Sequence, residues 1–316
     1  MKAGKRLKQY GFTDSTQAYN AAVRHIELRK KGLITPYKTG WERINRLLGG
    51  GIQPSTVYTI GGRPGHGKST IVNEMLYDMC ELNGIENTVF LYWSWEMTDY
   101  QQIIRGFSGD LGCTVQQLLS AELPLNDTLF SQILKSREKW VHYPIYFMSY
   151  SCTPKYIYNL CKDVQGTDPG LRIVNIFDHT RLAKKQSGMR SEEEKIRRLY
   201  HVAQQLSVNF GAINIILSQL NREIENDRRR NNPIPRLSDF FGADAVAQFS
   251  NVAIALQRPE IYHLEAYMKE QTRNLLAVHV LKNRDGDLGW IPFDHNLAHN
   301  TIKERYPVAQ QLTYQL

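Results

Sequence analysis

The stretch GGRPGHGKST, residues 61–70, decides how the chain folds. It fits the pattern G-x-x-x-x-G-K-[ST], with Gly62, Gly67, Lys68 and Ser69 at the fixed positions. Glycines there let backbone N–H groups point inward, and a helix that starts after the loop adds its own amides, so the backbone can hold phosphate. In such a loop the lysine reaches the β- and γ-phosphates of a nucleotide, and the hydroxyl holds Mg²⁺. The predicted nucleotide-binding residues are Gly62, Arg63, Pro64, Gly65, His66, Gly67, Lys68, Ser69 and Thr70, and no separate role follows for the His66 side chain.

The runs of sequence on both sides of this loop predict the fold class. A β-rich run precedes the loop and a helical run, residues 69–82, follows it. Another helical stretch, residues 191–211, ends at Gly211 as a candidate C-cap. Apolar strands interleaved with helices indicate an α/β fold, with a mostly parallel sheet covered on both faces. The predicted strands lie within 55–62, 87–96, 171–180, 211–220, 251–258 and 275–284.

Composition limits the class of protein. The chain has 316 residues and 42% hydrophobic content, which suits one large α/β domain with an appendage. It has no run of about 18 apolar residues and no apolar segment of a secretory signal, so we expect a cytoplasmic protein that does not engage a membrane. Its four cysteines form no C-x-x-C pair, which argues against a zinc site. The net charge of +8 favours a polyanionic partner.

We expect three segments along the chain. Residues 1–33 form an N-terminal helical linker, with a helix at 15–31 that has Ser15 or Thr16 as its N-cap. This helix packs on its own chain or docks on a neighbouring one. Residues 34–303 form the ATPase domain, and residues 304–316 form a C-terminal tail.

Three polar side chains end predicted strands, at the edge where open α/β sheets bind their ligands. Glu96 is placed to polarise the water that attacks a γ-phosphate, or it is an ordinary acid near a helix N-terminus. Asp178 ends a mostly apolar strand, the usual pattern for a carboxylate that binds Mg²⁺ directly or through water. Gln219 is placed to hydrogen-bond the γ-phosphate and report its presence to the next loop, or it is a plain strand-end glutamine.

Two further cations end the last predicted strand. Lys282 and Arg284 are two residues apart and therefore lie on the same side of that strand. Two cations in step at a sheet end suit a phosphate clamp. The alternative is that they are surface charges on an edge hairpin.

Two segments, residues 183–194 and 222–239, read as loops. They are either solvated insertions or surfaces for a polyanion. The first holds Lys184, Lys185 and Arg190, and the second holds Arg222, Arg228, Arg229 and Arg230.

The order of the motifs resembles the RecA-like motor domain of ring-shaped replicative DNA helicases, the DnaB/Twinkle group of superfamily four. The motifs are GRPGHGKS, SWEM, FDH, LSQLNR and KNRDGDLG, and the resemblance covers residues 34 to 300. SWEM resembles the family's S-L-E-M, and LSQLNR is close to the bacterial DnaB type. SDFFGADAVAQFSNVAIALQRPEIY resembles the DnaB stretch from the DNA loop to an R-x-E-x-Y. FDH and KNRDGDLG lean toward the phage and mitochondrial primase-helicase branch, and this mixture suggests a phage or mobile-element member.

The resemblance implies a role for each candidate residue. Lys68 and Ser69 bind phosphate and Mg²⁺, Glu96 is the catalytic base, Asp178 is the Walker B acid, Gln219 is the γ-phosphate sensor, and Arg284 with Lys282 beside it forms an arginine finger that reaches the neighbouring subunit's ATP site.

The resemblance also implies partners. It predicts a homo-oligomeric ring, a hexamer, that hydrolyses ATP with Mg²⁺ and moves 5′→3′ on single-stranded DNA. The two loops would line the ring and grip DNA by charge rather than sequence. A primase or a helicase loader is a candidate protein partner.

Two departures from the family pattern matter. Phe241 stands where DnaB has a DNA-contacting arginine, so it stacks on a base or packs within the ring. The bacterial family has an N-terminal collar domain of roughly a hundred residues that meets primase. Here about thirty residues precede the motor fold, so we expect a member without the collar, and primase binding does not carry over.

Other readings share the phosphate loop. A RecA-like recombinase filament, or a regulatory ATPase that binds DNA without unwinding it, would have the same Walker motifs and catalytic glutamate. SQLNR and the SDFFGADAVAQ stretch favour the helicase. A metabolic kinase would leave the basic loops without a use.

Overall fold

The computed structural model describes residues 2–122, 125–185, 188–189, 191–225 and 233–306. Contacts divide the chain into two compact units, residues 1–36 and 37–316. The first unit holds α1 (Lys2–Gln9) and α2 (Ser15–Lys30). The N-cap of α2 is Asp14 rather than Ser15 or Thr16. The Asp14 carboxylate accepts the Gln17 amide at 2.8 Å, and the Gln17 side chain accepts the Asp14 amide at 3.4 Å, which completes a capping box.

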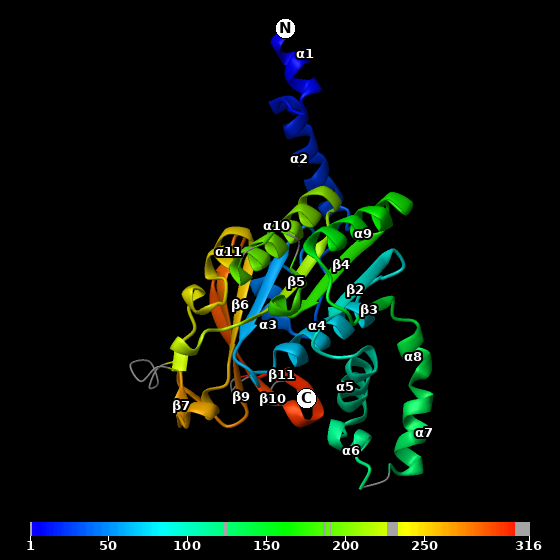
Figure 1. The fold of residues 1–316 in the computed structure, drawn as a ribbon, viewed down its shortest axis with the longest axis vertical. Coiled ribbons are helices and arrows are strands. Elements are labelled where there is room, and N and C mark those ends of the chain that lie inside the picture. The colour runs from blue at the N-terminus through cyan, green and yellow to red at the C-terminus, as the bar shows by residue number, and fades with distance from the viewer. Residues whose placement is uncertain (1, 123–124, 186–187, 190, 226–232, 307–316) are drawn as a thin grey trace. The chain divides into compact units, whose positions relative to one another are not determined.

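Within the described residues, the second unit is built on a nine-stranded sheet with the order β11-β10-β9-β6-β1-β5-β4-β2-β3 (Figure 1). The neighbours from β6 to β3 in this order are parallel, whereas β9, β10 and β11 continue the sheet in antiparallel pairing. The prediction of a mostly parallel sheet is confirmed. The strands are β1 (Val57–Gly62), β2 (Thr88–Ser94), β3 (Ile145–Met148), β4 (Arg172–Asp178), β5 (Ile213–Gln219), β6 (Val252–Gln257), β9 (Leu275–Asn283), β10 (Gly289–Asn296) and β11 (Thr301–Glu304), and a separate ribbon pairs β7 (Ala266–Tyr267) with β8 (Glu270–Gln271).

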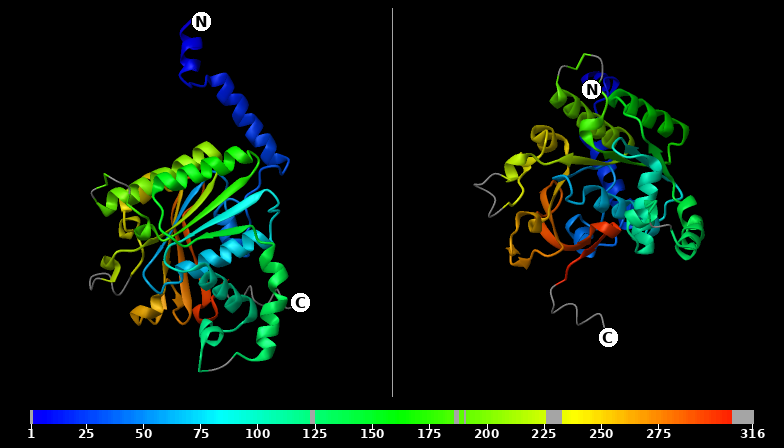
Figure 2. Two further views of the ribbon diagram at one scale, coloured as in Figure 1. Left: turned by 45° about the vertical axis from the view of Figure 1, so that its right-hand side comes forward. Right: turned by 60° about the horizontal axis from the view of Figure 1, so that its bottom comes forward.

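Helices cover both faces of this sheet, as the left view of Figure 2 shows. On one face, α3 and α4 bury apolar side chains such as Ile44, Ile71 and Met75 against the strands. On the other face, α9, α10 and α11 do the same, with Leu199 and Val246 fully buried. The bounds are α3 (Glu42–Leu47), α4 (Lys68–Glu81), α9 (Pro154–Thr167), α10 (Glu192–Phe210) and α11 (Ala243–Phe249).

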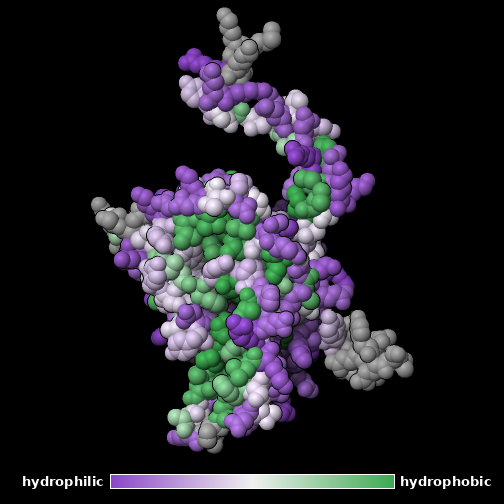
Figure 3. Space-filling view, turned by 90° about the vertical axis from the view of Figure 1, so that its right-hand side faces the viewer, coloured by the Kyte–Doolittle hydropathy of each residue, from purple (hydrophilic) through white to green (hydrophobic). Residues whose placement is uncertain are grey.

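A helical segment between β2 and β3 packs beside α4. It comprises α5 (Asp99–Leu111), α6 (Val115–Leu119), α7 (Asp127–Lys135) and α8 (Arg137–Val141). The Trp140 ring meets the rings of Tyr77, Phe107 and Tyr143 edge-on and leaves no space for a Cβ on Gly106. Phe130, Leu134 and Val141 of this segment remain exposed, and Figure 3 shows hydrophobic surface on this side of the molecule.

The two segments predicted as loops contain some regular structure. Because α10 begins at Glu192, the end of the first segment is helical, while η1 (Thr180–Leu182) precedes it. The second segment includes η2 (Arg222–Glu225) and η3 (Leu237–Asp239). Arg190, Arg228, Arg229 and Arg230 lie outside the described residues.

The last strand of the second unit ends one residue beyond the expected domain boundary. β11 extends to Glu304, whose carboxylate accepts the amides of Arg43 and Ile44 at 2.9 and 3.0 Å, so the expected boundary at 303 divides a strand. Among the described residues, no helix combines the length and the apolar composition needed to span a bilayer.

Candidate nucleotide-binding site

The phosphate loop joins the carboxyl end of β1 to the N-terminus of α4. Gly67 is the N-cap of α4 and has φ +80°, in the left-handed region that favours glycine. The first turn of α4 holds no acidic side chain, so the partial positive charge at its N-terminus is available to an anion. Lys68 Nζ donates to the carbonyl oxygens of Gly62 at 3.0 Å and Arg63 at 3.2 Å. Burial lowers the pKa of Lys68, and the carboxylates of Asp178 and Glu96 act against that shift.

Ser69 and Asp178 meet beside this loop. Ser69 Oγ donates to Asp178 Oδ2 at 3.2 Å, and the Tyr92 hydroxyl donates to the same oxygen at 3.4 Å. Asp178 is only 2% exposed, and burial, followed by the nearby Glu96 carboxylate, raises its pKa to about 6. A hydroxyl and a carboxylate brought together offer the oxygen donors that Mg²⁺ prefers. Tyr92 was not predicted as a site residue, because it lies in the middle of an apolar strand.

Glu96 follows β2 and faces His179. Its Oε2 lies 3.6 Å from His179 Nε2, and the Glu96 side chain is 55% exposed whereas the His179 side chain is 9% exposed. The Arg181 amide donates to His179 Nδ1 at 3.3 Å, which leaves Nε2 as the protonated nitrogen of the neutral ring. Burial lowers the pKa of His179. The buried His179 imidazole therefore lies beside the exposed Glu96 carboxylate, a neighbour that the sequence did not reveal.

Gln219 ends β5 directly beside Gly62 in the parallel register. Its carbonyl accepts the Phe241 amide at 2.8 Å, and Leu220 forms an isolated bridge with Phe240. The Phe240 ring packs so closely on Gly61 that no Cβ fits there. Asn221 N donates to Asp239 O at 2.6 Å, so both ends of segment 222–239 are fastened at the edge of the phosphate loop.

The R-x-E-x-Y stretch, residues 258–262, also contacts the phosphate loop. Arg258 Nη1 donates to Gly65 O at 2.8 Å and pairs with Glu260, which also contacts His295. The His66 side chain points into this layer: it is 1% exposed, and its Nδ1 lies 3.4 Å from both Leu256 O and Arg258 N. Its ring also meets Tyr262 edge-on.

Thr70 is similarly turned inward. It is buried, and its hydroxyl donates to Asn300 Oδ1 at 3.5 Å. The side chains of His66 and Thr70 thus support the loop from within the protein.

Replacing His66 by glutamine should give a pH-dependent loss of stability. Burial lowers the pKa of His66 to about 4 from 6.5, so the unfolded chain alone binds a proton between those values. The stability from the neutral ring is complete above pH 6.5 and is lost as the pH falls toward 4. We expect the difference in the free energy of unfolding between wild type and His66→Gln to narrow by up to about 3 kcal/mol from pH 7 to pH 4, as measured by urea denaturation. The exposed His142→Gln variant serves as the control substitution.

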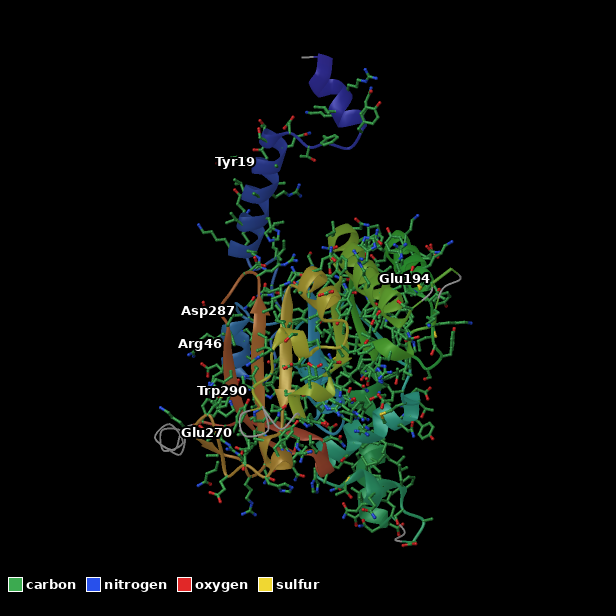
Figure 4. The ribbon with its side chains drawn as sticks, turned by 60° about the vertical axis from the view of Figure 1, so that its left-hand side comes forward. Tyr19, Arg46, Glu194, Glu270, Asp287 and Trp290 are labelled. Atoms are coloured by element: carbon green, nitrogen blue, oxygen red, sulfur yellow. The ribbon has the colours of Figure 1, made fainter. Side chains whose placement is uncertain are left out.

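Lys282 and Arg284 lie at the other end of the same sheet. Because β9 runs antiparallel to β6, Lys282 pairs with Ala253 near the start of β6, whereas Leu256, near its end, pairs with Gly62. Both cations point the same way, as predicted: Lys282 Nζ donates to Ala247 O at 2.6 Å and Arg284 Nη2 to Gln248 O at 2.8 Å. These are carbonyls of the last turn of α11. In Figure 4 the labelled side chains of Asp287, which follows β9, and Glu270, which precedes it, mark the two ends of this strand.

The described candidates for DNA contact are spread over two loops. Lys184 and Arg222 are exposed, and Lys185 Nζ pairs with Glu192 at 3.0 Å. Phe241 packs against the core beneath α10, with the Arg181 guanidinium 4.9 Å from its ring centroid. It also lines a cavity of about 810 Å³ together with Asn221 of the same region.

A phosphate loop, a hydroxyl–carboxylate pair and a strand-end glutamate on a sheet of this strand order define a P-loop fold of the RecA-like class. The chain belongs to the DnaB-like helicase C-terminal domain family, whose model matches residues 37–304.

Relatives of known name support this placement. The chain is 25% identical over 279 residues to the replicative DNA helicase DnaB of Buchnera aphidicola subsp. Baizongia pistaciae (strain Bp), covering 83% of this chain and 55% of that protein. It is 22% identical over 284 residues to the replicative DNA helicase DnaC of Bacillus subtilis (strain 168), with the same shares covered. The chain thus spans about half the length of these relatives. The DNA repair protein RadA of Haemophilus influenzae (strain ATCC 51907 / DSM 11121 / KW20 / Rd) is 36% identical over 109 residues, which are 34% of this chain and 21% of RadA.

Solved structures show the same fold. The ATPase domain of G40P matches with a TM-score of 0.79 at 19% identity, covering 93% of this chain and 100% of that one. A DnaB-like replicative helicase, solved in a study of its interactions with primase, matches with a TM-score of 0.75 at 20% identity, covering 90% of this chain and 66% of that one.

Proposed function

We propose that this chain is the motor domain of a replicative DNA helicase, an ATP hydrolase that moves 5′→3′ on single-stranded DNA as a hexameric ring. One observation carries the proposal. The carboxyl ends of the parallel strands bring together Lys68, Ser69, Glu96, Asp178 and Gln219. The opposite end of the sheet holds Lys282 and Arg284. A second subunit would then be needed to bring Arg284 to each ATP site.

Within one subunit, each side chain has a separate task. Lys68 would leave its carbonyl partners to neutralise the β- and γ-phosphates, and Gln219 would hydrogen-bond the γ-phosphate. Ser69 and Asp178 would hold Mg²⁺, which supplies charge neutralisation on the phosphates when bound. Glu96 would accept the proton of the attacking water, with His179 holding its carboxylate in place.

The neighbouring subunit completes the proposed site. Arg284, with Lys282 beside it, would place positive charge on the oxygens of the transferring phosphoryl group. In the single subunit both side chains donate to carbonyl oxygens of the last turn of α11. When two subunits pack, the cations would either leave these carbonyls or move together with the end of α11.

We propose that DNA passes through the ring and contacts the two basic segments. Lys184, Lys185 and Arg222 are the described cations there, with Arg190, Arg228, Arg229 and Arg230 outside the described residues and Phe241 as a candidate for base stacking. Residues 1–33 would serve as a docking linker, 34–304 as the motor, which ends with β11, and 305–316 as a tail. A primase or a helicase loader is a candidate partner, and the cytoplasm of a bacterial cell, with a phage as one candidate source, is the expected place of action.

The helicase proposal is tested by ATP hydrolysis and strand separation measured together. We expect single-stranded DNA to stimulate hydrolysis, a forked duplex to be unwound only with ATP, and electron microscopy with an ATP analogue and DNA to show a ring around the strand. Lys68→Ala serves as the inactive control. Unstimulated hydrolysis by a stable monomer would contradict the proposal.

A RecA-like recombinase or a regulatory DNA-dependent ATPase is the alternative that shares the same phosphate loop, and the family match over residues 37–304 favours the helicase. It predicts an open filament on DNA, or DNA binding without unwinding. The same micrographs and the same forked substrate separate the two candidates.

A further inference from the structure

One ion pair joins the phosphate loop to the start of the second basic segment. Arg63 Nε donates to Glu225 Oε1 at 2.6 Å and Arg63 Nη2 to Glu225 Oε2 at 3.1 Å, across a sequence separation of 162 residues. A third donor, Arg63 Nη1, bonds Leu220 O at 3.1 Å. The guanidinium thus holds η2 by its last residue and the chain just before η2 by a main-chain oxygen.

This ion pair is less exposed and held in a more fixed geometry than an ordinary surface ion pair. The Arg63 side chain is 15% exposed and the Glu225 side chain 38% exposed, whereas the exposed pair of Arg46 with Glu42 on α3 has side chains that are 75% and 61% exposed. Two parallel N–H···O bonds fix the orientation of both partners as well as their distance. The position of Glu225 is therefore tied to the position of the Arg63 side chain.

Arg63 also contacts the lysine of the phosphate loop. Its carbonyl oxygen accepts Lys68 Nζ at 3.2 Å, so the main chain of Arg63 holds Lys68 while its side chain holds Glu225. If Lys68 turns to the phosphates of a nucleotide, the Arg63 carbonyl loses that donor and keeps the His66 amide, which donates to it at 3.1 Å. A change at Lys68 therefore reaches the main chain of Arg63, whose side chain holds Glu225.

We propose that Arg63 is a positioning residue that transmits nucleotide binding through Glu225 to η2, and so sets the affinity of the protein for single-stranded DNA at η2, where Arg222 is exposed. This route differs from the expected role of Gln219, which would sense the γ-phosphate directly from β5. The inference rests on the proposed function, because it assumes that η2 contacts DNA.

The Glu225→Gln variant tests this coupling without hydrolysis. Anisotropy of a labelled oligo-dT is measured with the 316-residue chain, once with ADP and once with a non-hydrolysable ATP analogue, and the ratio of the two Kd values for DNA reports the coupling. We expect a wild-type ratio of about 5- to 150-fold, and a ratio within about 2-fold of unity for Glu225→Gln. Glu223→Gln is the matched control, since it removes the same charge from the same η2 turn and should keep the wild-type ratio.

A reversed pair separates geometry from charge. Arg63→Glu alone should lose the coupling, and the double variant Arg63→Glu with Glu225→Arg should regain a measurable part of it. Equal ratios for Glu225→Gln, Glu223→Gln and wild type would overturn the inference and leave the helicase proposal intact. A wild-type protein whose DNA affinity ignores nucleotide would overturn both.

Discussion

Replacing Arg284 by alanine is expected to lower kcat of DNA-stimulated ATP hydrolysis by about 10³-fold or more, with little change in ATP affinity. The side chain lies at the opposite end of the sheet from Lys68 and therefore cannot touch a nucleotide bound in its own subunit. Its charge would act on the transition state in a neighbouring site, which affects kcat rather than binding. Single-turnover hydrolysis and nucleotide titration measure the two quantities separately.

The controls for Arg284→Ala guard against loss of folding or assembly. Because Arg284 also donates to Gln248 O at the end of α11, thermal unfolding and ring formation must be compared with wild type. Arg46→Ala removes an exposed arginine from α3 and should hydrolyse ATP normally. Normal turnover by Arg284→Ala would show that the arginine finger is assigned to the wrong residue.

A Glu96→Gln substitution is expected to lower kcat by about 10²- to 10⁴-fold and to leave ATP binding intact. Glutamine keeps the size of the side chain and its contact distance to His179, but it cannot accept the proton of the attacking water. The exposed Asp99→Asn, at the start of α5, removes an equal charge from the same end of the sheet and serves as the control. Hydrolysis near the wild-type rate would place the general base elsewhere.

Mixing the two inactive variants tests where the arginine acts. A ring assembled from equal amounts of Arg284→Ala and Glu96→Gln subunits contains interfaces that join an intact glutamate to an intact arginine, at about a quarter of the sites in a random closed ring. Activity should return to a comparable fraction if the sites act independently. If Arg284 served its own subunit, no interface in the mixture would be competent and no activity would return.

The sequence predicted the parts of the fold that depend on local pattern. The central parallel strands are buried on both faces and therefore read as apolar runs, which located β1, β2, β4, β5 and β6. The short edge strand β3 and the alternating strands β10 and β11 lack that signal and were not predicted. The convergence of Glu96, Asp178 and Gln219 followed from strand ends alone, since carboxyl ends of parallel strands share one edge.

The contacts across long separations could not be predicted. No pattern in GRPGHGKS indicates that Arg63 pairs with Glu225, that His66 packs on the R-x-E-x-Y stretch, or that Thr70 meets Asn300. These partners are fixed by packing between elements that are far apart in the chain, and only the strand order places them together. The spacing of Arg258, Glu260 and Tyr262 was a usable signal, because three polar residues in alternate positions after an apolar strand must serve some contact.

The closed base of segment 222–239 affects how well the fold tolerates changes in the length of this segment. Its ends meet at the Leu220–Phe240 bridge and are pinned beside Gly61 and Gly62, so the chain leaves the sheet and returns at one place. The cost of closing such an excursion rises only slowly with its length. A change in the length of the excursion is therefore expected to leave the geometry of the hydrolytic centre intact, as long as its two fastened ends are kept.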